Sequence, residues 1–259
     1  MHGMGGNIGE AVGPILTGFL IGFMLWRDVL KLSFIPALVI GVGIYVLLRT
    51  ISSRSGSTSG REYFGGVKAA LRNKNLLLVL TATAFFSGSQ IAIMSFLPIY
   101  AREDLALSTV ATGALVSLLQ VAGIASSPVL GHFSDQLGRR VVLLLGFGGL
   151  ALGSLMLFLT GDGPLFYLAI AITGLFLFPM MSILLAAAMD VVGDGVQGTT
   201  VSLVFGVSII LAAGSGWLAG RIADIYGVDT VFLYASVPAG AAFILTLFGS
   251  KRRAVPNKG

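Results

Sequence analysis

Long apolar runs separated by short polar segments dominate this sequence. Each run is close to the roughly 20 residues that an α-helix needs to cross the hydrocarbon core of a bilayer. The runs lie at 3–25, 32–48, 76–98, 109–130, 141–160, 164–189, 199–220 and 230–249. The pattern therefore predicts an all-α, multi-pass membrane protein with eight transmembrane helices.

The composition fits a chain that is buried in lipid. Of its 259 residues, 56% are hydrophobic and 10% are charged, which is far from the balance of soluble globular domains. There is no cysteine and there are only two histidines, so disulfides and thiolate metal sites are excluded. The sequence contains no nucleophile motif, zinc motif or phosphate loop. We therefore predict no metal site, no cofactor and no enzyme activity.

The basic residues fall mainly on one side when the polar segments are assigned alternately to the two membrane faces. Twelve lie on one side and four on the other. Segments rich in Lys and Arg stay in the cytoplasm, so we predict that both termini are cytoplasmic and that the chain lies in a cell inner membrane. The net charge of +5 then reflects membrane orientation and not nucleic-acid binding.

A ten-residue polar hinge, from Gly131 to Arg140, separates two of the apolar runs. Gly131 and Gly138 permit a sharp turn. Asp135 is placed to accept backbone N–H groups where the next helix begins. Arg139 and Arg140 close the hinge and hold it at the cytoplasmic side. The pattern predicts a charged, rigid corner between two antiparallel helices.

The spacing Gly-x3-Asp-x2-Gly-Arg-Arg in this hinge resembles the loop motif of the major facilitator superfamily of secondary transporters. The resemblance implies that Asp135, Arg139 and Arg140, set by Gly131 and Gly138, form a charge lock between cytoplasmic helix ends that shifts with alternating access. An ordinary positively charged loop would explain the arginines but not the spacing of the glycines and the aspartate.

The first apolar run carries a second signature. Gly9, Gly13 and Gly18 belong to a small-residue face that allows another helix to approach closely, and Pro14 interrupts it. The run resembles the glycine-proline motif on the fifth helix of drug:proton antiporters of the same superfamily, with Thr17 in place of one glycine. The resemblance implies export in exchange for protons. A packing face with no bearing on transport direction is the alternative.

One long polar segment, 51–75, divides the chain. It reads as a flexible cytoplasmic linker followed by a short amphipathic helix. The resemblance implies that 1–50 holds the last two helices of an N-terminal half, that 76–250 forms a six-helix C-terminal half, and that 251–259 is a basic cytoplasmic tail. We therefore expect a partial major-facilitator fold, helices five to twelve, that lacks the first four helices.

An internal repeat supports this placement. A shift of 202 residues aligns Gly18 with Gly220 and Pro36 with Pro238. The first two apolar runs then correspond to the last two, as expected for a transporter built from two similar halves.

Polar side chains within the apolar runs are candidates for substrate contact, because a polar group that faces lipid has no partner. Ser87, Gln90 and Met94 share one helical face of the run 76–98. Gln120 lies in the next run, and an interhelical hydrogen bond is an equally good role for it.

Two further candidates lie in the run 164–189. Phe176 and Met180 lie roughly on one face and suit a broad apolar ligand, although plain packing is the alternative. Pro179 is expected to kink this helix.

Glu10 is the one formal charge inside an apolar run. A carboxylate in the hydrocarbon region is costly, so it tends to be paired, protonated or placed on an aqueous path. Glu10 is therefore the candidate for proton coupling. Its place near the start of the chain favours a simpler role at an exposed helix end.

These features favour a secondary transporter that exports small, largely apolar compounds in exchange for protons. Its expected partners are the lipid bilayer, a small-molecule substrate and protons. Import of a small metabolite is one alternative. Another is a non-transporting fragment or interaction module that pairs with the missing N-terminal helices or with another chain.

Overall fold

The computed structural model describes residues 13, 16–49, 72–161, 163–192 and 197–249, and these residues form helices and no strand. The helices are α2 (Trp26–Leu48), α4 (Lys74–Glu103), α5 (Thr109–Gln136), α6 (Arg139–Thr160), α7 (Pro164–Leu177), α8 (Pro179–Asp190), α9 (Gln197–Tyr226) and α10 (Thr230–Phe248). Seven stretches of this part of the chain are long and apolar enough to cross a membrane, with α7 and α8 counted as one. The prediction of an all-α, multi-pass membrane fold is therefore confirmed.

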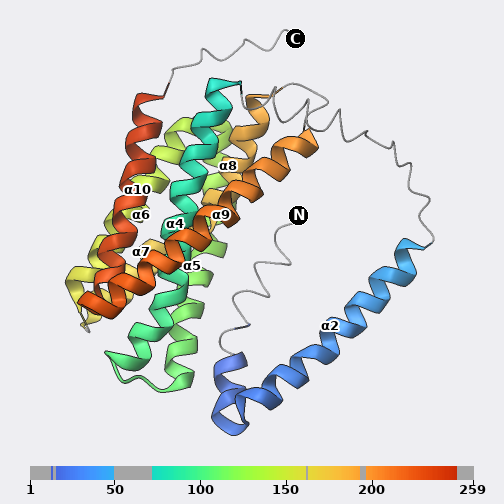
Figure 1. The fold of residues 1–259 in the computed structure, drawn as a ribbon, viewed down its shortest axis with the longest axis vertical. Coiled ribbons are helices and arrows are strands. Elements are labelled where there is room, and N and C mark those ends of the chain that lie inside the picture. The colour runs from blue at the N-terminus through green and yellow to red at the C-terminus, as the bar shows by residue number, and fades with distance from the viewer. Residues whose placement is uncertain (1–12, 14–15, 50–71, 162, 193–196, 250–259) are drawn as a thin grey trace.

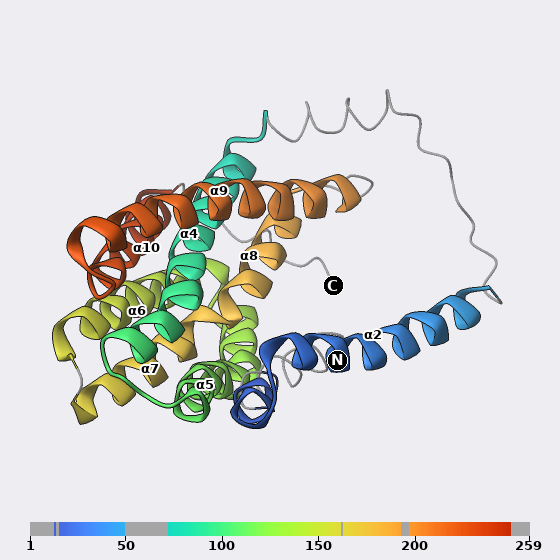
Figure 2. The ribbon, with the colours of Figure 1, turned by 60° about the horizontal axis from the view of Figure 1, so that its bottom comes forward.

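The first apolar run lies mostly outside the described residues. Of this run, 16–23 are helical, and Glu10, Gly9 and Pro14 are not described. In Figures 1 and 2, α2 stands apart from the other helices, and only 6% of its most apolar window is buried.

The helices from α4 to α10 form one bundle (Figure 1). Helix α4 contacts α5, α8, α9 and α10, while α6 contacts α5, α7, α8 and α10. The fully buried rings of Phe86 in α4 and Phe147 in α6 face each other with centroids 6.4 Å apart. In a soluble protein, burial of a ring of this size stabilises the fold by about 2–3 kcal/mol. In lipid this hydrophobic contribution is absent, and close packing between the helices stabilises their association.

Polar side chains also tie the bundle together inside the membrane. Ser215 in α9 donates to the carbonyl oxygen of Gly88 in α4 at 2.8 Å, and its Oγ lies 2.9 Å from the hydroxyl of Tyr234 in α10. Ser89 donates to the carbonyl oxygen of Ala235 at 2.7 Å. Hydrogen bonds of this kind fix the relative position of membrane helices because lipid offers polar groups no other partner.

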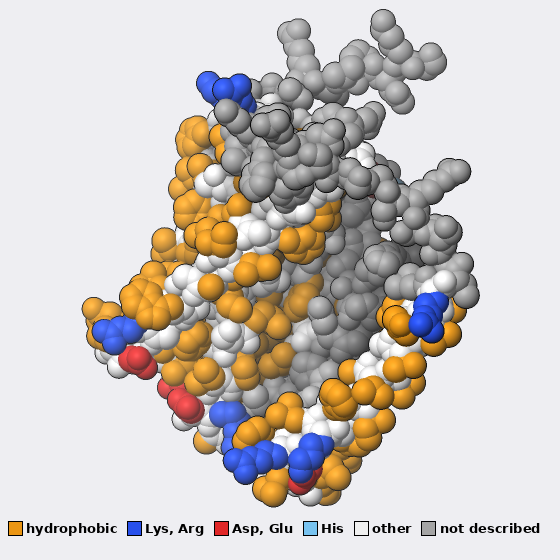
Figure 3. Space-filling view, turned by 45° about the vertical axis from the view of Figure 1, so that its right-hand side comes forward, with side chains coloured by type: hydrophobic (Ala, Val, Ile, Leu, Met, Phe, Trp, Pro, Cys, Tyr) orange, Lys and Arg blue, Asp and Glu red, His pale blue; other side chains and the backbone are white. Residues whose placement is uncertain are grey.

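The surface of the described part suits a lipid environment. In Figure 3 the charged side chains on the face shown lie toward its edges, and the described surface between them is mainly hydrophobic. Large apolar side chains such as Ile209, Ile210 and Trp217 of α9 are about 70% exposed. A soluble protein rarely exposes such a continuous apolar area.

The predicted ten-residue hinge is wrong in its extent. Helix α5 continues through Gly131 and Asp135 to Gln136, and α6 begins at Arg139. Gly138 caps α6 without a side-chain hydrogen bond, so Asp135 does not cap that helix. The error has a simple cause: a drop in hydropathy marks where the chain leaves the hydrocarbon, and a helix can continue into the polar region.

The turn itself depends on Gly138, as predicted. Gly138 has φ +91°, a conformation that residues with a Cβ atom rarely adopt. The predicted kink at Pro179 is also confirmed, since α7 ends at Leu177 and α8 begins at Pro179.

Candidate functional site

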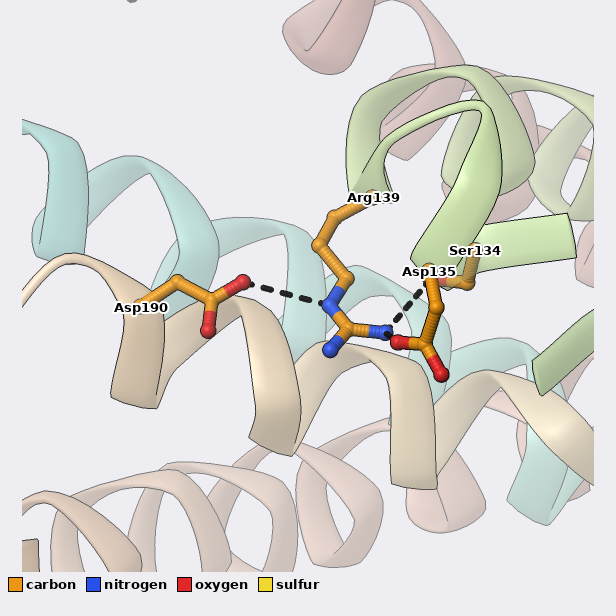
Figure 4. A network of polar contacts seen from close by, with 4 residues as sticks. All are labelled: Ser134, Asp135, Arg139 and Asp190. Carbon is orange, nitrogen blue, oxygen red and sulfur yellow. Dashed lines mark hydrogen bonds and ion pairs between the residues drawn. The ribbon is translucent and has the colours of Figure 1, made fainter. Parts of the chain in front are cut away.

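Arg139 forms a polar cluster where α5, α6 and α8 meet. Its Nη1 atom lies 2.5 Å from Oδ1 of Asp135 and donates to Oγ of Ser134 at 3.0 Å. Its Nε atom donates to Oδ2 of Asp190 at 3.2 Å. Figure 4 shows the guanidinium between the two carboxylates. We call Ser134, Asp135, Arg139 and Asp190 the Arg139 cluster.

The Arg139 cluster is only partly shielded from solvent. The side chains of Asp135 and Asp190 are 66% and 57% exposed, and that of Arg139 is 29% exposed. Exposed ion pairs contribute about 0.2–1 kcal/mol. The cluster therefore joins the ends of α5, α6 and α8 but contributes little to the stability of the fold.

Arg140 points to a different helix. Its Nε atom donates to the carbonyl oxygen of Thr246 at 3.2 Å, and Nη2 donates to that of Leu247 at 2.6 Å. These carbonyls lie in the last turn of α10, where four carbonyl groups lack helical partners and attract cations. The two adjacent arginines thus link the start of α6 to three other helix ends.

Asn73 provides a second contact to the end of α8. Its Oδ1 atom accepts hydrogen bonds from the backbone N–H groups of Asn75 and Leu76 and so caps α4. Its Nδ2 atom donates to the carbonyl oxygen of Val191 at 2.8 Å. The end of α8 is therefore held by Arg139 through Asp190 and by Asn73 through Val191.

A cavity of about 740 Å³, open to the surface, lies between Gly13, residues 17–21, α4, α5 and the junction of α7 and α8. Its volume is in the range of small-molecule sites. The residues that line it carry no formal charge. They are Gly13, Thr17, Gly18, Ile21, Gln90, Met94, Pro98, Thr109, Thr112, Gly113, Val116, Gln120 and Phe178.

Gln120 is the most informative side chain of the cavity wall. The residue is 4% exposed, and its Oε1 atom has no hydrogen-bond partner among the described residues. An unpaired buried acceptor costs about 1–3 kcal/mol. The interhelical hydrogen bond considered for Gln120 is not formed by this atom, which is itself buried although the residue lines the cavity.

The other predicted contact residues divide into two groups. Gln90 and Met94 line the cavity, whereas Ser87 is buried in α4 outside the lining. Phe176 and Met180 pack against α6, where they occupy the space beside Gly149 and Gly146. These packing contacts agree with the alternative role considered for both residues.

Gly13 and Gly18 of the glycine-proline motif both line the cavity. A Cβ atom on Gly18 would lie 2.9 Å from the carbonyl oxygen of Thr109, so this position needs glycine for close contact with the start of α5. Gly18 of the motif therefore packs closely against α5 at the cavity wall.

Two residues of these candidate sites were not assigned to them by reasoning from the sequence. Phe178 lines the cavity at the break before Pro179, and the only available signal was its position next to a proline inside an apolar run. Asp190 joins the Arg139 cluster, but nothing in the sequence connects it with a residue 51 positions away. Within the described residues, no group of three or more His, Cys, Asp or Glu side chains could hold a metal ion.

Comparison with known proteins gives matches over most of the chain. A family model described as Major Facilitator Superfamily matches residues 1–215. A "Putative proline/betaine transporter" of Staphylococcus haemolyticus is 24% identical over 161 residues, which cover 59% of this chain and 34% of the relative. A tetracycline resistance protein, class D, of Salmonella ordonez is 30% identical over 185 residues, which cover 68% of this chain and 45% of the relative.

Solved structures show the same fold. The Escherichia coli fucose:proton symporter FucP matches with a TM-score of 0.67 at 16% identity, over 85% of this chain and 54% of the symporter chain. A bacterial homologue of the iron transporter ferroportin, in an inward-facing state, matches with a TM-score of 0.60 at 19% identity, over 92% of this chain and 59% of that chain. The chain thus spans about a third to three fifths of the length of these proteins.

Proposed function

The chain belongs to the Major Facilitator Superfamily, and we propose on this basis that it serves in the export of a small, largely apolar compound in exchange for protons. Transport would proceed by rocking of two helical halves about a site near the middle of the membrane. We further propose that α4 to α10 correspond to the C-terminal half and that residues 1–50 belong to the N-terminal half.

The observation that carries this proposal is the buried, unpaired Oε1 atom of Gln120, a residue that lines the cavity. A buried acceptor without a partner is costly, and a substrate that donates a hydrogen bond removes that cost. Gln90 supplies a second carboxamide, and Met94 and Phe178 supply apolar walls. The roles in substrate contact predicted for Ser87, Phe176 and Met180 have no such support from the cavity.

The character of the lining favours a substrate with little net charge. No Asp, Glu, His, Lys or Arg lies among the residues that line the described cavity. Moving a charged group from water into such surroundings is costly unless it is paired. A planar, mostly apolar molecule with hydroxyl or amide donors meets these requirements.

The proposed direction and coupling have two supports. The glycine-proline motif contributes Gly13 and Gly18 to the cavity wall, and one relative is a tetracycline resistance protein with 30% identity. Glu10 is the one formal charge inside an apolar run of the sequence, and we assign it the role of proton carrier because a carboxylate in such a run is costly unless it is neutralised by a proton.

The proposed lock is the Arg139 cluster together with Arg140. These contacts join the ends of α5, α6, α8 and α10. We place this end of the bundle, and both termini, in the cytoplasm because most basic residues of the chain lie on this side. Opening of the lock would accompany the change of access.

Accumulation of tetracycline in everted membrane vesicles tests the proposal. Vesicles that contain the full chain, energised by an imposed pH gradient, should accumulate tetracycline above the level of vesicles without the chain. A protonophore should abolish the difference. The same vesicles with Gln120→Ala should accumulate severalfold less, because the hydrogen-bond acceptor of the cavity is lost.

Two outcomes would contradict proton-coupled export. One is equal accumulation with and without the chain. The other is accumulation that survives the protonophore. Gln136→Ala is a matched control, because Gln136 is an exposed carboxamide at the end of α5 and does not line the cavity. This variant should transport like the unchanged chain.

Import of a small zwitterion is the second candidate function. The relative named for proline and betaine favours it, whereas the uncharged cavity lining argues against it. Excess proline betaine should compete with tetracycline if the site accepts zwitterions. Absence of competition would count against import of proline betaine.

An interaction module is the third candidate. Helices α2 and α9 are the least buried spans, with 6% and 11% of their most apolar windows buried. A partner of the same fold would cover such surfaces. The test compares the chain alone in liposomes with the chain co-expressed with a separate N-terminal half. Transport only in the second case would support an interaction module in place of an independent exporter.

A further inference from the structure

The membrane span 164–190 is broken between α7 and α8. Helix α7 ends at Leu177, α8 begins at Pro179, and Phe178 stands between them with helical torsion angles. Proline has no backbone N–H, so Pro179 cannot donate to the carbonyl oxygen four residues earlier. That carbonyl belongs to Leu175 and loses its helical partner.

A side chain from a neighbouring helix supplies the missing donor. The hydroxyl of Ser126 in α5 donates to the carbonyl oxygen of Leu175 at 2.7 Å. The same Oγ lies 3.0 Å from the carbonyl oxygen of Gly123 in its own helix. A serine hydroxyl carries a single proton, and the shorter contact is the one that crosses to α7. Prolines are tolerated in membrane helices where such a side chain satisfies the freed carbonyl group.

The same place on α5 receives the ring of Phe178. A Cβ atom on Gly123 would lie 2.5 Å from Cδ2 of Phe178, so the ring rests directly on the backbone of α5. Phe178 also lines the cavity together with Gln120. Gly123 and Ser126 are one helical turn apart on the same face. Ser126, which donates to the interrupted helix, and Gly123, against which the ring of Phe178 packs, therefore lie side by side.

We propose that Ser126 is a positioning residue that replaces the hydrogen bond removed by Pro179 and thereby holds Phe178 in the cavity wall. Without the hydroxyl, the carbonyl group of Leu175 has to tilt toward another donor, and the break next to it changes its geometry. Phe178 follows because it is the residue within the break. The ring of Phe178 then forms part of the cavity wall only while Ser126 holds it in place. Its contact with a substrate rests on the proposed function of the cavity.

Fluorine NMR on the full chain in detergent tests this assignment. Phe178 is replaced by 4-fluorophenylalanine, and the spectrum is recorded for the unchanged chain, for Ser126→Ala and for Ser126→Thr. We expect one resonance for the unchanged chain and for Ser126→Thr, which retains the hydroxyl. Ser126→Ala should show a second resonance, with the ratio of the two ring positions changed by about three- to thirtyfold, the effect of one hydrogen bond between membrane helices.

Pro179→Ala makes the test specific. Alanine restores the N–H group that can donate to the carbonyl oxygen of Leu175, so in this background Ser126→Ala should have no further effect on the spectrum. Equal effects of Ser126→Ala with and without Pro179 would overturn the proposal, as would a Ser126→Ala spectrum identical to that of the unchanged chain. If Ser126→Ala alone does not fold, a well-folded double variant supports the proposal and a double variant that also fails to fold overturns it.

The spectrum also separates this proposal from the function of the cavity. The dependence on Ser126 and Pro179 requires no substrate and no transport. Tetracycline added to the unchanged chain should shift the fluorine resonance if the ring contacts the ligand. A resonance that depends on Ser126 but does not respond to tetracycline would retain the positioning role and contradict the assignment of Phe178 as a substrate contact.

Discussion

Arg139 and Asp190 lie 51 residues apart in the sequence, yet the Nε atom of Arg139 donates to Oδ2 of Asp190 at 3.2 Å. The contact joins the first residue of α6 to the last residue of α8. Helix α8 starts at the break before Pro179 and is held at its other end by this ion pair and by Asn73. Movement of α8 about the break therefore requires these contacts to open.

Asp190→Asn should affect transport more than stability. An exposed ion pair contributes about 0.2–1 kcal/mol, so the melting temperature should fall by no more than about 4 °C. The rate of tetracycline accumulation in vesicles should fall severalfold, because the two helix ends no longer close as firmly. Asp224→Asn is the control, since Asp224 is an exposed carboxylate of α9 outside the cluster. Similar rates for the two variants would argue against a lock at Asp190.

Asn73 combines two functions that substitution can separate. Asn73→Asp retains a side-chain oxygen to cap α4 but loses the N–H donor to Val191. We expect a loss of about 1 kcal/mol, the net contribution of one hydrogen bond. Asn73→Ala loses the cap as well, which adds about 1 kcal/mol. Thermal unfolding in detergent measures both, and an equal loss for the two variants would show that the contact with Val191 does not stabilise the chain.

Gly138 and Gly131 form a matched pair for the geometry of the turn. Gly138 has φ +91°, so Gly138→Ala should destabilise the chain by about 1–3 kcal/mol through backbone strain. Gly131 lies inside α5 with no atom within 4 Å of an added Cβ, so Gly131→Ala should be neutral or stabilise the helix by up to about 1 kcal/mol. Thermal unfolding of the two variants is the measurement. A ten-residue hinge predicts that both substitutions lower the melting temperature, whereas the two-residue turn predicts that only Gly138→Ala does.

Most of the fold follows from hydropathy, because only helices satisfy every backbone group within a single membrane span. The apolar runs therefore predict the number and approximate position of the spans, and Pro179 predicts the break in one of them. The ends of the helices do not follow. Helix α9 extends to Tyr226 and α4 to Glu103, beyond their apolar runs, because polar residues continue a helix outside the hydrocarbon.

The site is less predictable than the fold. Gln90 and Gln120 line the cavity because polar side chains on a helical face are costly toward lipid and so turn inward. Met94 lines it because it shares the helical face of Gln90. Phe176 and Met180 were also chosen from their shared helical face, but they pack against α6 and do not line the cavity. Aromatic and thioether side chains are equally suited to lipid, to helix packing and to a ligand, so their position on a face does not distinguish these roles. Contacts between distant helices, such as those of Asp190 and Ser126, depend on packing angles that periodicity does not contain.

Gln120→Met tests whether the unpaired carboxamide is kept for binding. The substitution removes a buried acceptor that has no partner among the described residues and retains a side chain of similar length. The free energy of unfolding should rise by about 1 kcal/mol, because the cost of the unpaired oxygen disappears, and the melting temperature should rise by about 2–4 °C. Tetracycline binding, measured by equilibrium dialysis of the purified chain, should weaken about tenfold, which corresponds to about 1.4 kcal/mol.

Ser117→Ala is the matched control for the expected gain in stability and loss of tetracycline binding in Gln120→Met. The Oγ atom of Ser117 also lacks a hydrogen-bond partner among the described residues, and the residue is 2% exposed, but it does not line the cavity. Its replacement should leave tetracycline binding unchanged while keeping or raising the melting temperature. If Gln120→Met gains stability without losing affinity, as Ser117→Ala does, the oxygen of Gln120 is a packing defect and the cavity recognises its ligand through other groups.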